Sequence, residues 1–300
     1  MISLPSGIDN KSLIDDLKIF SWEASDALLY YAQILKDTNN KSNILKNDNI
    51  DDPVTAADLK VNQIIIQSIN ENYKNIGWEI LSEENVKSAP FESDKTISWK
   101  WILDPLDGTK DFIQGTSNYA MHLALNYKDN PYIGIVLIPE KDELWISNGQ
   151  KVWCENRNGL KIKYNFAKNK SLQEMTLVTS KNHSNEALKN LIQKICFKKV
   201  KVMGSIGCKI ASILRGETDI YICLSQPGKS SPKDWDFAAP AAILKTAGGA
   251  ITNLDNQNLS YGQSNFEHGG VIIASNNSQN HKQLCVEIKE IIKKYNLYSI

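Results

Sequence analysis

Six short β-prone segments follow one another between residues 78 and 156, with no helix-length segment between them. Each is rich in β-branched and aromatic residues and is bounded by turn-forming residues, which is typical of strands. In chain order they are WEILSEE, WKWILDP, YAMHLALNY, YIGIVLIP, ELWISNG and KVWCEN. Because strands joined by short connections pair in antiparallel fashion, this stretch predicts an antiparallel sheet.

Helical periodicity precedes this sheet. Apolar side chains recur at helical spacing over residues 11–36, which predicts a long amphipathic helix. A second helix is predicted from Thr55, whose hydroxyl can cap it, to about Tyr73. The polar, asparagine-rich stretch of residues 37–52 is predicted to be an exposed, mobile loop or hairpin.

Strand-like and helical segments alternate after residue 171, and a final helix is expected over residues 279–295. The strand-like segments are TLVTS, KKVKVMG, DIYICLS, GAITNLD and GGVIIAS, and the helical ones are NEALKNLIQKIC, CKIASILRG and AAPAAILKTAGG. No linker composition separates the two parts of the chain. The sequence therefore predicts an α+β front half, residues 1–170, fused to an α/β rear half, residues 171–300, with a shared core.

The charge balance argues against two classes of partner. Lysines and arginines number 34 and acids number 34, giving a formal net charge of +0, so we expect no general attraction to nucleic acid polymers or anionic membranes. No signal peptide, transit peptide or membrane-spanning apolar run is recognised. The five cysteines lack a C-x-x-C pair, which indicates reduced thiols and disfavours zinc. These features predict a cytoplasmic protein.

The stretch WILDPLDGTK carries residues suited to metal and phosphate chemistry. Asp104 and Asp107 lie three apart, the intervening proline favours extended geometry, and Gly108 permits backbone conformations closed to other residues. Both carboxylates and the carbonyl of Leu106 could then face one space, and oxygen-only ligands suit Mg²⁺ or Mn²⁺. A helix starting at Thr109 would add free amide groups for a phosphate.

An aspartate-rich turn is also ordinary surface structure. Two further acid pairs weaken that interpretation: Glu83 and Glu84 end the WEILS segment, and Asp234 and Asp236 flank a tryptophan before an apolar helix. The EF-hand pattern fails at both ends of its loop. The D-x-D-G-T motif of haloacid-dehalogenase-like phosphatases needs two acids two residues apart, so an attacking aspartate is disfavoured.

Four motifs together resemble a known family. DPVTAAD, LSEEN, WILDPLDGTKDF and DWDFAAPAAILKTAGG occur in this order, and they resemble the metal- and lithium-sensitive phosphatases of the inositol monophosphatase superfamily. The similarity spans nearly the whole chain, and the conjunction of motifs is far more specific than any one of them. The resemblance implies a layered αβαβα sandwich of the sugar-phosphatase type.

Other segments are most similar to the 3′(2′),5′-bisphosphate nucleotidases, which remove the 3′-phosphate from 3′-phosphoadenosine 5′-phosphate. They are DGTKDF with its Lys110, SKNHSN at 180–185 and GSIGCKIASILRGETDIYIC at 204–223. The resemblance implies a small phosphorylated nucleotide as partner, including the 5′-phosphosulfate, and a monomer or homodimer. Inositol monophosphate or sugar bisphosphate hydrolysis is the alternative, and a non-catalytic phosphonucleotide sensor is a third.

The resemblance also implies two or three Mg²⁺ ions, which Mn²⁺ can replace. Glu83, Asp104 and the carbonyl of Leu106 would hold the first ion. Asp104, Asp107 and Asp236 would hold the second. All these ligands are oxygens, as Mg²⁺ prefers.

Further roles follow from the same resemblance. A third, weaker ion would lie near Glu83 and Glu84. Asp58 and Thr109 would orient or deprotonate the attacking water, with Glu83 nearby. The amides of Gly108 and Thr109 would bind the phosphate that leaves. Without the resemblance, Asp58 is better explained as a first-turn acid stabilised by the helix dipole.

At the nucleotide end, His183, Ser205 and Lys209 match the family's adenosine and 5′-phosphate contacts, and Lys110 and Asp236 complete the expected substrate contacts. Without the resemblance, a loop histidine and a solvent-facing helix lysine are the simpler interpretations.

One position departs from the nucleotidase pattern. Some nucleotidases carry an arginine where this chain has Cys223. Arg215, Lys229 and Lys233 are the candidates to supply the missing charge.

Overall fold

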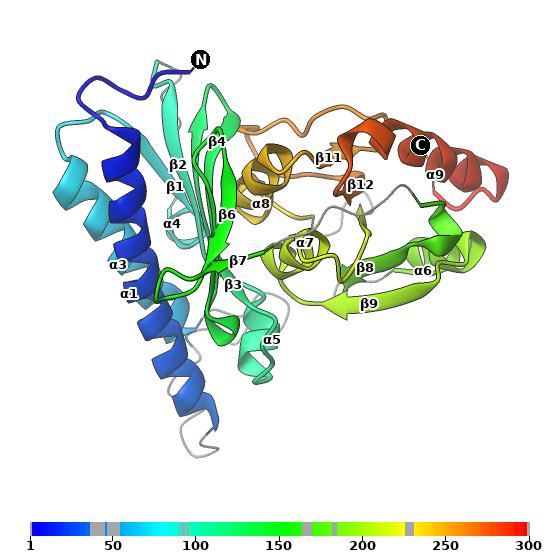
Figure 1. Ribbon diagram of the computed structural model, residues 1–300, viewed down its shortest axis with the longest axis horizontal. Helices are drawn as coiled ribbons and strands as arrows, with labels where there is room; N and C mark the ends of the chain where they lie inside the picture. The colour runs from blue at the N-terminus through cyan, green and yellow to red at the C-terminus, as the bar shows by residue number, and fades with distance from the viewer. Residues whose placement is uncertain are drawn as a thin grey trace.

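The computed structural model describes residues 2–36, 46, 55–89, 91, 94, 96–163, 170–181, 185–225 and 231–298. Its elements form two sheets with helices between and outside them (Figure 1). The helices are α1 (Asn10–Lys36), α3 (Ala56–Tyr73), α4 (Glu83–Ser88), α5 (Thr109–Ile113), α6 (Glu186–Ile195), α7 (Ile206–Leu214), α8 (Asp234–Thr246) and α9 (Ser278–Lys294), with 3₁₀ turns at Pro139–Lys141 and Leu172–Glu174. The strands are β1 (Glu79–Ser82), β2 (Trp99–Asp107), β3 (Ala120–Tyr127), β4 (Asn130–Ile138), β5 (Glu143–Ser147), β6 (Val152–Glu155), β7 (Lys161–Ile162), β8 (Thr176–Ser180), β9 (Lys199–Met203), β10 (Ile220–Ser225), β11 (Ala250–Asn253) and β12 (Gly270–Ser275).

The larger sheet has the strand order β1-β2-β3-β4-β5-β6-β7. Strands β2 to β7 pair with their neighbours in antiparallel fashion, as predicted. The prediction was wrong for the first pair, because β1 and β2 run parallel, with Glu79 opposite Lys100. A parallel pair needs a crossover connection, and the chain between these strands contains the short helix α4.

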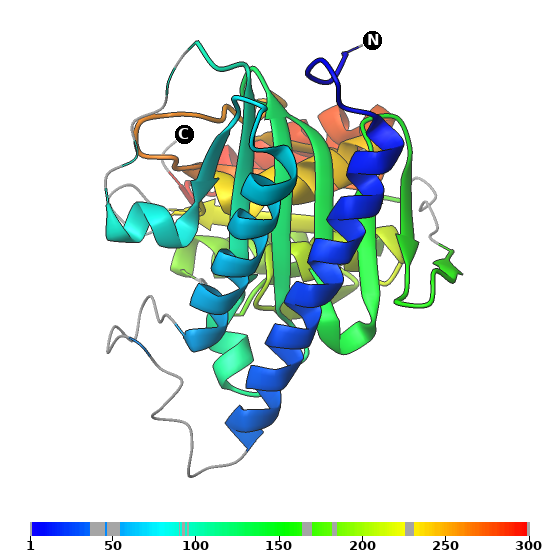
Figure 2. The same ribbon diagram turned by 90° about the vertical axis from the view of Figure 1, so that its left-hand side faces the viewer.

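Helices α1 and α3 cover one face of the larger sheet (Figure 2). Leu13, Leu17 and Leu28 of α1 are fully buried, as are Val61 and Ile65 of α3. The predicted amphipathic helices are therefore both present and bury their apolar stripes against the sheet. The predicted loop over residues 37–52 lies outside the described residues, except for Lys46.

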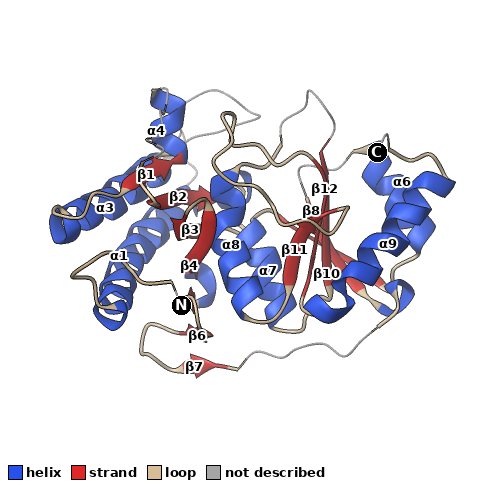
Figure 3. Ribbon diagram, turned by 90° about the horizontal axis from the view of Figure 1, so that it is seen from above, coloured by secondary structure: helices blue, strands red, loops and turns tan. Residues whose placement is uncertain are grey.

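The smaller sheet has the strand order β11-β12-β10-β8-β9, in which β8, β9 and β10 are parallel and β12 is antiparallel to its neighbours. Seen from above, α6 and α9 lie outside this sheet, and α7 and α8 lie between it and the larger one (Figure 3). The layers therefore run helix, sheet, helix, sheet, helix. This is the predicted αβαβα sandwich.

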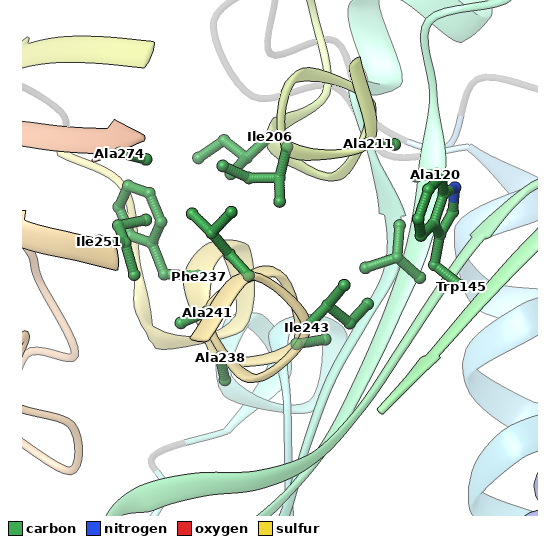
Figure 4. Close-up of a cluster of buried hydrophobic side chains, with 14 of the residues drawn as sticks. Ala120, Trp145, Ile206, Ala211, Phe237, Ala238, Ala241, Ile243, Ile251 and Ala274 are labelled. Carbon is green, nitrogen blue, oxygen red and sulfur yellow. The ribbon is translucent and has the colours of Figure 1, made fainter. Parts of the chain in front are cut away.

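One apolar core fills the space around α7 and α8 between the two sheets. Figure 4 shows Phe237 and Ile243 of α8 among side chains from both sheets, including Trp145 and Ile251. Helix α8 can approach strand β4 closely because Gly134 has no side chain. A Cβ at this position would lie only 2.7 Å from the carbonyl oxygen of Ala239. The division into halves at residue 170 stays a prediction, since this core is built from both of them.

None of the described helices combines the length and apolar composition needed to cross a membrane.

Candidate active site

Strand β2 ends in the two aspartates of the DPLDGT stretch, and all of its residues are buried. Its pairing with β3 is irregular between Asp104 and Asp107, where a proline has no N–H to donate to the ladder. The N–H of Leu106 instead donates to Asp104 Oδ1 at 3.0 Å. This irregularity lets two side chains three residues apart face the same place.

The turn after β2 requires a glycine. Gly108 has φ +89°, and a Cβ there would lie 2.8 Å from the carbonyl oxygen of Asn118 and 3.1 Å from the amide of Ser205. It caps helix α5, which begins at Thr109. The predicted strand-to-helix turn is therefore present, and its glycine brings the start of α7 close to the two aspartates.

Asp107 is held by the first turn of α7. Its Oδ2 accepts a hydrogen bond from Ser205 Oγ at 2.7 Å, and it also accepts from the amides of Ile206 and Gly207. His122 Nε2, on strand β3, lies 3.2 Å from the same oxygen. His122 could not be predicted from the sequence because it lies inside an otherwise apolar strand segment with no motif around it.

Asp236 joins these acids from the first turn of α8. One oxygen from each of Asp104, Asp107 and Asp236 lies within 4.8 Å of the others. Burial, with the nearby carboxyls, raises the pKa of Asp104 and of Asp236 well above the usual range. Within the described part of the chain, no lysine or arginine forms an ion pair with any of these three acids. We call Asp104, Asp107 and Asp236 the acid cluster.

The acid cluster fits a divalent cation. Its donors are all oxygens, they converge on one place, and their mutual repulsion is what a cation would relieve. Oxygen-only donors suit Mg²⁺ or Mn²⁺ better than zinc. By contrast, Asp234 turns away from the cluster, since its carboxyl oxygens contact Gly262 N and His268 Nε2.

Glu83 and Glu84 open helix α4 next to the acid cluster. The carboxyl of Glu83 contributes, after burial, to the raised pKa of Asp104. Lys87 Nζ lies 2.9 Å from Glu83 Oε1 and 3.4 Å from Glu84 Oε1. The roles of both glutamates as metal ligands stay predictions.

Asp58 belongs both to a helix cap and to the site. Thr55 caps α3 and donates through its amide, at 2.8 Å, and its hydroxyl, at 2.5 Å, to Asp58 Oδ2. The other carboxyl oxygen, Oδ1, lies 3.4 Å from Thr109 Oγ1. The single hydroxyl proton of Thr109 can go to this oxygen or to the carbonyl oxygen of Leu106, which is closer at 3.0 Å. Burial, reinforced by the charges of the nearby glutamates, raises the pKa of Asp58 to about 8.

Lys209 is fully buried on α7, so the solvent-facing interpretation of this lysine is wrong. Its Nζ donates to the carbonyl oxygen of Gly204 at 2.6 Å and lies 5.6 Å from the centre of the Tyr221 ring. Burial lowers the pKa of Lys209, while the charge of Asp107 opposes that shift. A buried ammonium therefore lies close to the acid cluster without forming an ion pair with it.

The other candidate cations around Cys223 are engaged elsewhere or not described. Arg215 forms an ion pair with Glu143 at 2.7 Å, and Lys233 forms one with Glu267 at 2.8 Å. Lys229 and His183 lie outside the described residues, and Lys110 is half-buried on α5. Lys209 is thus the lysine whose charge acts on the Cys223 thiol.

A model of the inositol monophosphatase family matches residues 14–293 of the chain. The chain belongs to the inositol monophosphatase family. The family resemblance, the fold and the prediction of a phosphatase are therefore confirmed.

Two curated relatives of the chain carry the same name. A 3′(2′),5′-bisphosphate nucleotidase CysQ from Buchnera aphidicola is 34% identical over 212 residues, which cover 71% of this chain and 75% of that protein. The protein of the same name from Haemophilus influenzae is 26% identical, covering 85% of this chain and 89% of its own.

Solved structures of the family share the fold. The Thermotoga maritima IMPase has a TM-score of 0.72 at 21% sequence identity, with 94% of this chain and 99% of that chain covered. A staphylococcal IMPase-II with 2′AMP bound has a TM-score of 0.68 at 20% identity, with 95% and 98% covered.

Proposed function

We propose that this chain is a Mg²⁺-dependent enzyme that hydrolyses the 3′-phosphate of 3′-phosphoadenosine 5′-phosphate to give AMP and phosphate, and acts on the 5′-phosphosulfate in the same way. The observation that carries the proposal is the buried Lys209 near the acid cluster. A bisphosphate nucleotide brings a second anionic group, and a buried ammonium is suited to neutralise it. The name of the CysQ relatives supports the same substrate class.

In this proposal the acid cluster, with Glu83 and the carbonyl of Leu106, holds two Mg²⁺ ions, and a third lies near Glu84; Mn²⁺ can replace them. When bound, the ions make water a better nucleophile and neutralise charge on the phosphoryl oxygens. The cluster itself stays fixed because Asp107 is tied to α7 by Ser205 and Asp236 is tied to the start of α8.

In this proposal Thr109 orients the attacking water and Asp58 accepts its proton. Thr109 Oγ1 can accept from the water when it donates its single proton to Asp58 Oδ1, 3.4 Å away, instead of to the carbonyl oxygen of Leu106. To accept that proton Asp58 must be ionised; burial raises its pKa to about 8 in the metal-free chain, and the positive charge of a bound cation would lower it towards neutral pH. Thr55 leaves Asp58 Oδ1 available for this task because it engages the other oxygen.

The remaining substrate contacts follow the turn and the start of α7. The amides of Gly108 and Thr109, at the beginning of α5, would bind the phosphate that leaves, with Lys110 beside them. Ser205 and Lys209, with His183, would bind the nucleotide end, and Asp236 would contact the sugar side of the substrate.

We also place the protein in the cytoplasm, because all five cysteines are free thiols. A monomer or a homodimer is compatible with this proposal.

A second candidate function is hydrolysis of inositol monophosphate or a sugar bisphosphate by the same residues. The observation that favours it is Cys223, a buried neutral thiol at the position where some nucleotidases carry an arginine. In addition, one of the solved staphylococcal structures is named for bound inositol monophosphate.

The test is phosphate release by the purified protein with Mg²⁺ from three substrates: 3′-phosphoadenosine 5′-phosphate, inositol 1-phosphate and fructose 1,6-bisphosphate. The proposal predicts the highest kcat/KM for the nucleotide. It also predicts that Lys209→Met raises KM for the nucleotide on the order of tenfold, with a smaller effect on inositol 1-phosphate, since a charge-assisted contact contributes about 1.5 kcal/mol. Release from inositol 1-phosphate alone would refute the nucleotide assignment. Tight nucleotide binding without any release would favour the sensor alternative.

A further inference from the structure

Residues Tyr261–His268 form a strap across the N-terminal end of helix α8, which carries Asp236. Lys233, just before the helix, pairs with Glu267 of the strap in an antiparallel β-bridge. The amide of His268 donates to the carbonyl oxygen of Pro232 at 2.8 Å. The strap is thus joined to the backbone of the two residues that precede α8.

Asp234, the first residue of α8, is held by the strap and has no part in the proposed chemistry. It is fully buried, and each carboxyl oxygen has one contact: His268 Nε2 lies 2.8 Å from Oδ1, and the amide of Gly262 donates to Oδ2 at 2.8 Å. Because a carboxylate only accepts hydrogen bonds, His268 must donate through Nε2. A buried carboxylate needs such partners, so this contact fixes both side chains.

The His268 ring has little freedom to move. Tyr261 contacts it edge-on with ring centres 5.0 Å apart, and Phe237 of α8 contacts it edge-on at 5.5 Å. His268 is 5% exposed. The ring therefore forms a rigid link between the strap and Asp234.

The strap reaches the acid cluster through Lys233. The amide of Lys233 donates to Asp236 Oδ2 at 2.5 Å, and one oxygen of the same carboxyl lies within 4.8 Å of oxygens of Asp104 and Asp107. The side chain of Lys233 donates to Glu267 Oε1 at 2.8 Å and to the carbonyl oxygen of Asn265 at 3.2 Å. Both the backbone and the side chain of Lys233 are thus held by the strap, and Lys233 sets the direction of the Asp236 carboxyl.

We propose that Asp234 and His268 are positioning residues that set the geometry of Asp236 for its cation, acting through the strap and Lys233. This inference rests on the proposed function, in which the acid cluster holds divalent ions. Partners of this kind, which orient a ligand without touching the metal, typically change metal affinity by about 10- to 100-fold when removed.

The experiment measures Mn²⁺ affinity by calorimetry, without substrate, on the full chain and its variants. His268→Ala is expected to weaken Mn²⁺ binding about tenfold or more, and His268→Gln, whose side-chain amide can still donate, to stay within about threefold of the parent protein. Asp234→Asn, which keeps the shape, is expected to weaken it by at least about threefold, and this variant decides the question if His268→Ala does not fold.

The matched control is His281→Gln. His281 is also a buried histidine of the rear half, with Ser275 Oγ and Thr252 Oγ1 each 2.8 Å from a ring nitrogen, but these partners lie on β12 and β11 and not on the strap. Its loss should lower the melting temperature and leave Mn²⁺ affinity unchanged. The inference would be overturned if His268→Ala or Asp234→Asn bound Mn²⁺ as tightly as the parent protein. It would also be overturned if His281→Gln lost as much Mn²⁺ affinity as His268→Ala. A parent protein that binds no Mn²⁺ would instead contradict the proposed function.

Discussion

Two groups of buried carboxylates in this protein have opposite surroundings. Glu143 on β5 lies 2.7 Å from Arg215 and accepts from the Trp145 indole N–H at 3.0 Å. Glu155 on β6 lies 3.0 Å from Lys18 and likewise accepts from a tryptophan N–H. In this group every buried acid has a cation that the chain itself supplies.

The acid cluster, at the end of β2 and the start of α8, lacks that kind of partner among the described residues. Burial and the charges of neighbouring carboxyls raise the pKa of Asp104 and of Asp236, and the buried ammonium of Lys209 is bonded to a carbonyl group instead. A buried charge is costly unless it is paired. The ion pairs of Glu143 and Glu155 stabilise the fold, whereas the acid cluster has the surroundings that our proposal requires of a site for a cation from solution.

The largest expected effect comes from removing a charge from the acid cluster. Asp104→Asn should lower kcat/KM about 1000-fold or more, because it removes several kcal/mol of electrostatic stabilisation at the reacting phosphate. The same variant should raise the free energy of unfolding in EDTA, since it removes a repelling carboxyl. Phosphate release and urea unfolding measure the two effects. Unchanged turnover would contradict the assignment of Asp104 to the metal site.

The metal-free protein should lose stability as the pH rises. The pKa of Asp58 is about 8 in the folded chain against 3.8 in model peptides, so between these pH values the folded chain holds a proton that the unfolded chain has released. The free energy of unfolding in EDTA should therefore fall by more than about 3 kcal/mol from pH 4 to pH 8. Mg²⁺ should largely abolish this loss. Urea unfolding at several pH values tests it, and a flat profile in EDTA would argue against buried, unpaired acids.

Breaking the ion pair of Glu143 with Arg215 should lower the free energy of unfolding and leave the acid cluster unchanged. Glu143→Gln leaves Arg215 partly buried with only Glu217 as its partner, and we expect about 3 kcal/mol of destabilisation. Mn²⁺ affinity should not change. Chemical unfolding and calorimetry on the same variant separate the two readouts, and a loss of Mn²⁺ affinity would erase the distinction between the two groups.

A smaller effect concerns His281, a buried histidine whose ring nitrogens contact two hydroxyl groups and no charged group among the described residues. Burial lowers the pKa of His281 to about 4, whereas the unfolded chain has a value near 6.5. As the pH falls below 6.5 the unfolded chain gains a proton that the folded chain does not, so stability present above pH 6.5 is lost towards pH 4. From pH 6.5 to 5 this amounts to about 2 kcal/mol. His281→Gln should show a shallower pH profile than the parent protein in thermal unfolding, and an identical slope would contradict this prediction.

Much of the fold and the centre of the site could be predicted from local patterns. Helical periodicity identified α1, α3 and α9, and the DPLDGT stretch identified the turn that holds Asp104 and Asp107. The parallel pairing of β1 and β2 was missed because α4 is too short to show periodicity. The burial of Lys209 could have been predicted from its neighbours. They are small or apolar on every side of α7, which is typical of a buried helix.

Contacts between distant segments left no local signal. His268 and Asp234 lie 34 residues apart, and His122 meets Asp107 only because β3 pairs with β2. Such contacts depend on how the layers pack, which periodicity and spacing do not encode. The convergence of the three acids of the cluster could be anticipated from the family motifs, but the contacts that His122 and His268 make around them could not.

The most direct test of the central claim is an anomalous difference map from crystals grown with Mn²⁺ and phosphate. The account predicts strong Mn²⁺ peaks among the carboxyl oxygens of Asp104, Asp107 and Asp236, and none beside Glu143 or Glu155. Peaks absent from the acid cluster at saturating Mn²⁺ would contradict the claim that its unpaired carboxyls are a metal site.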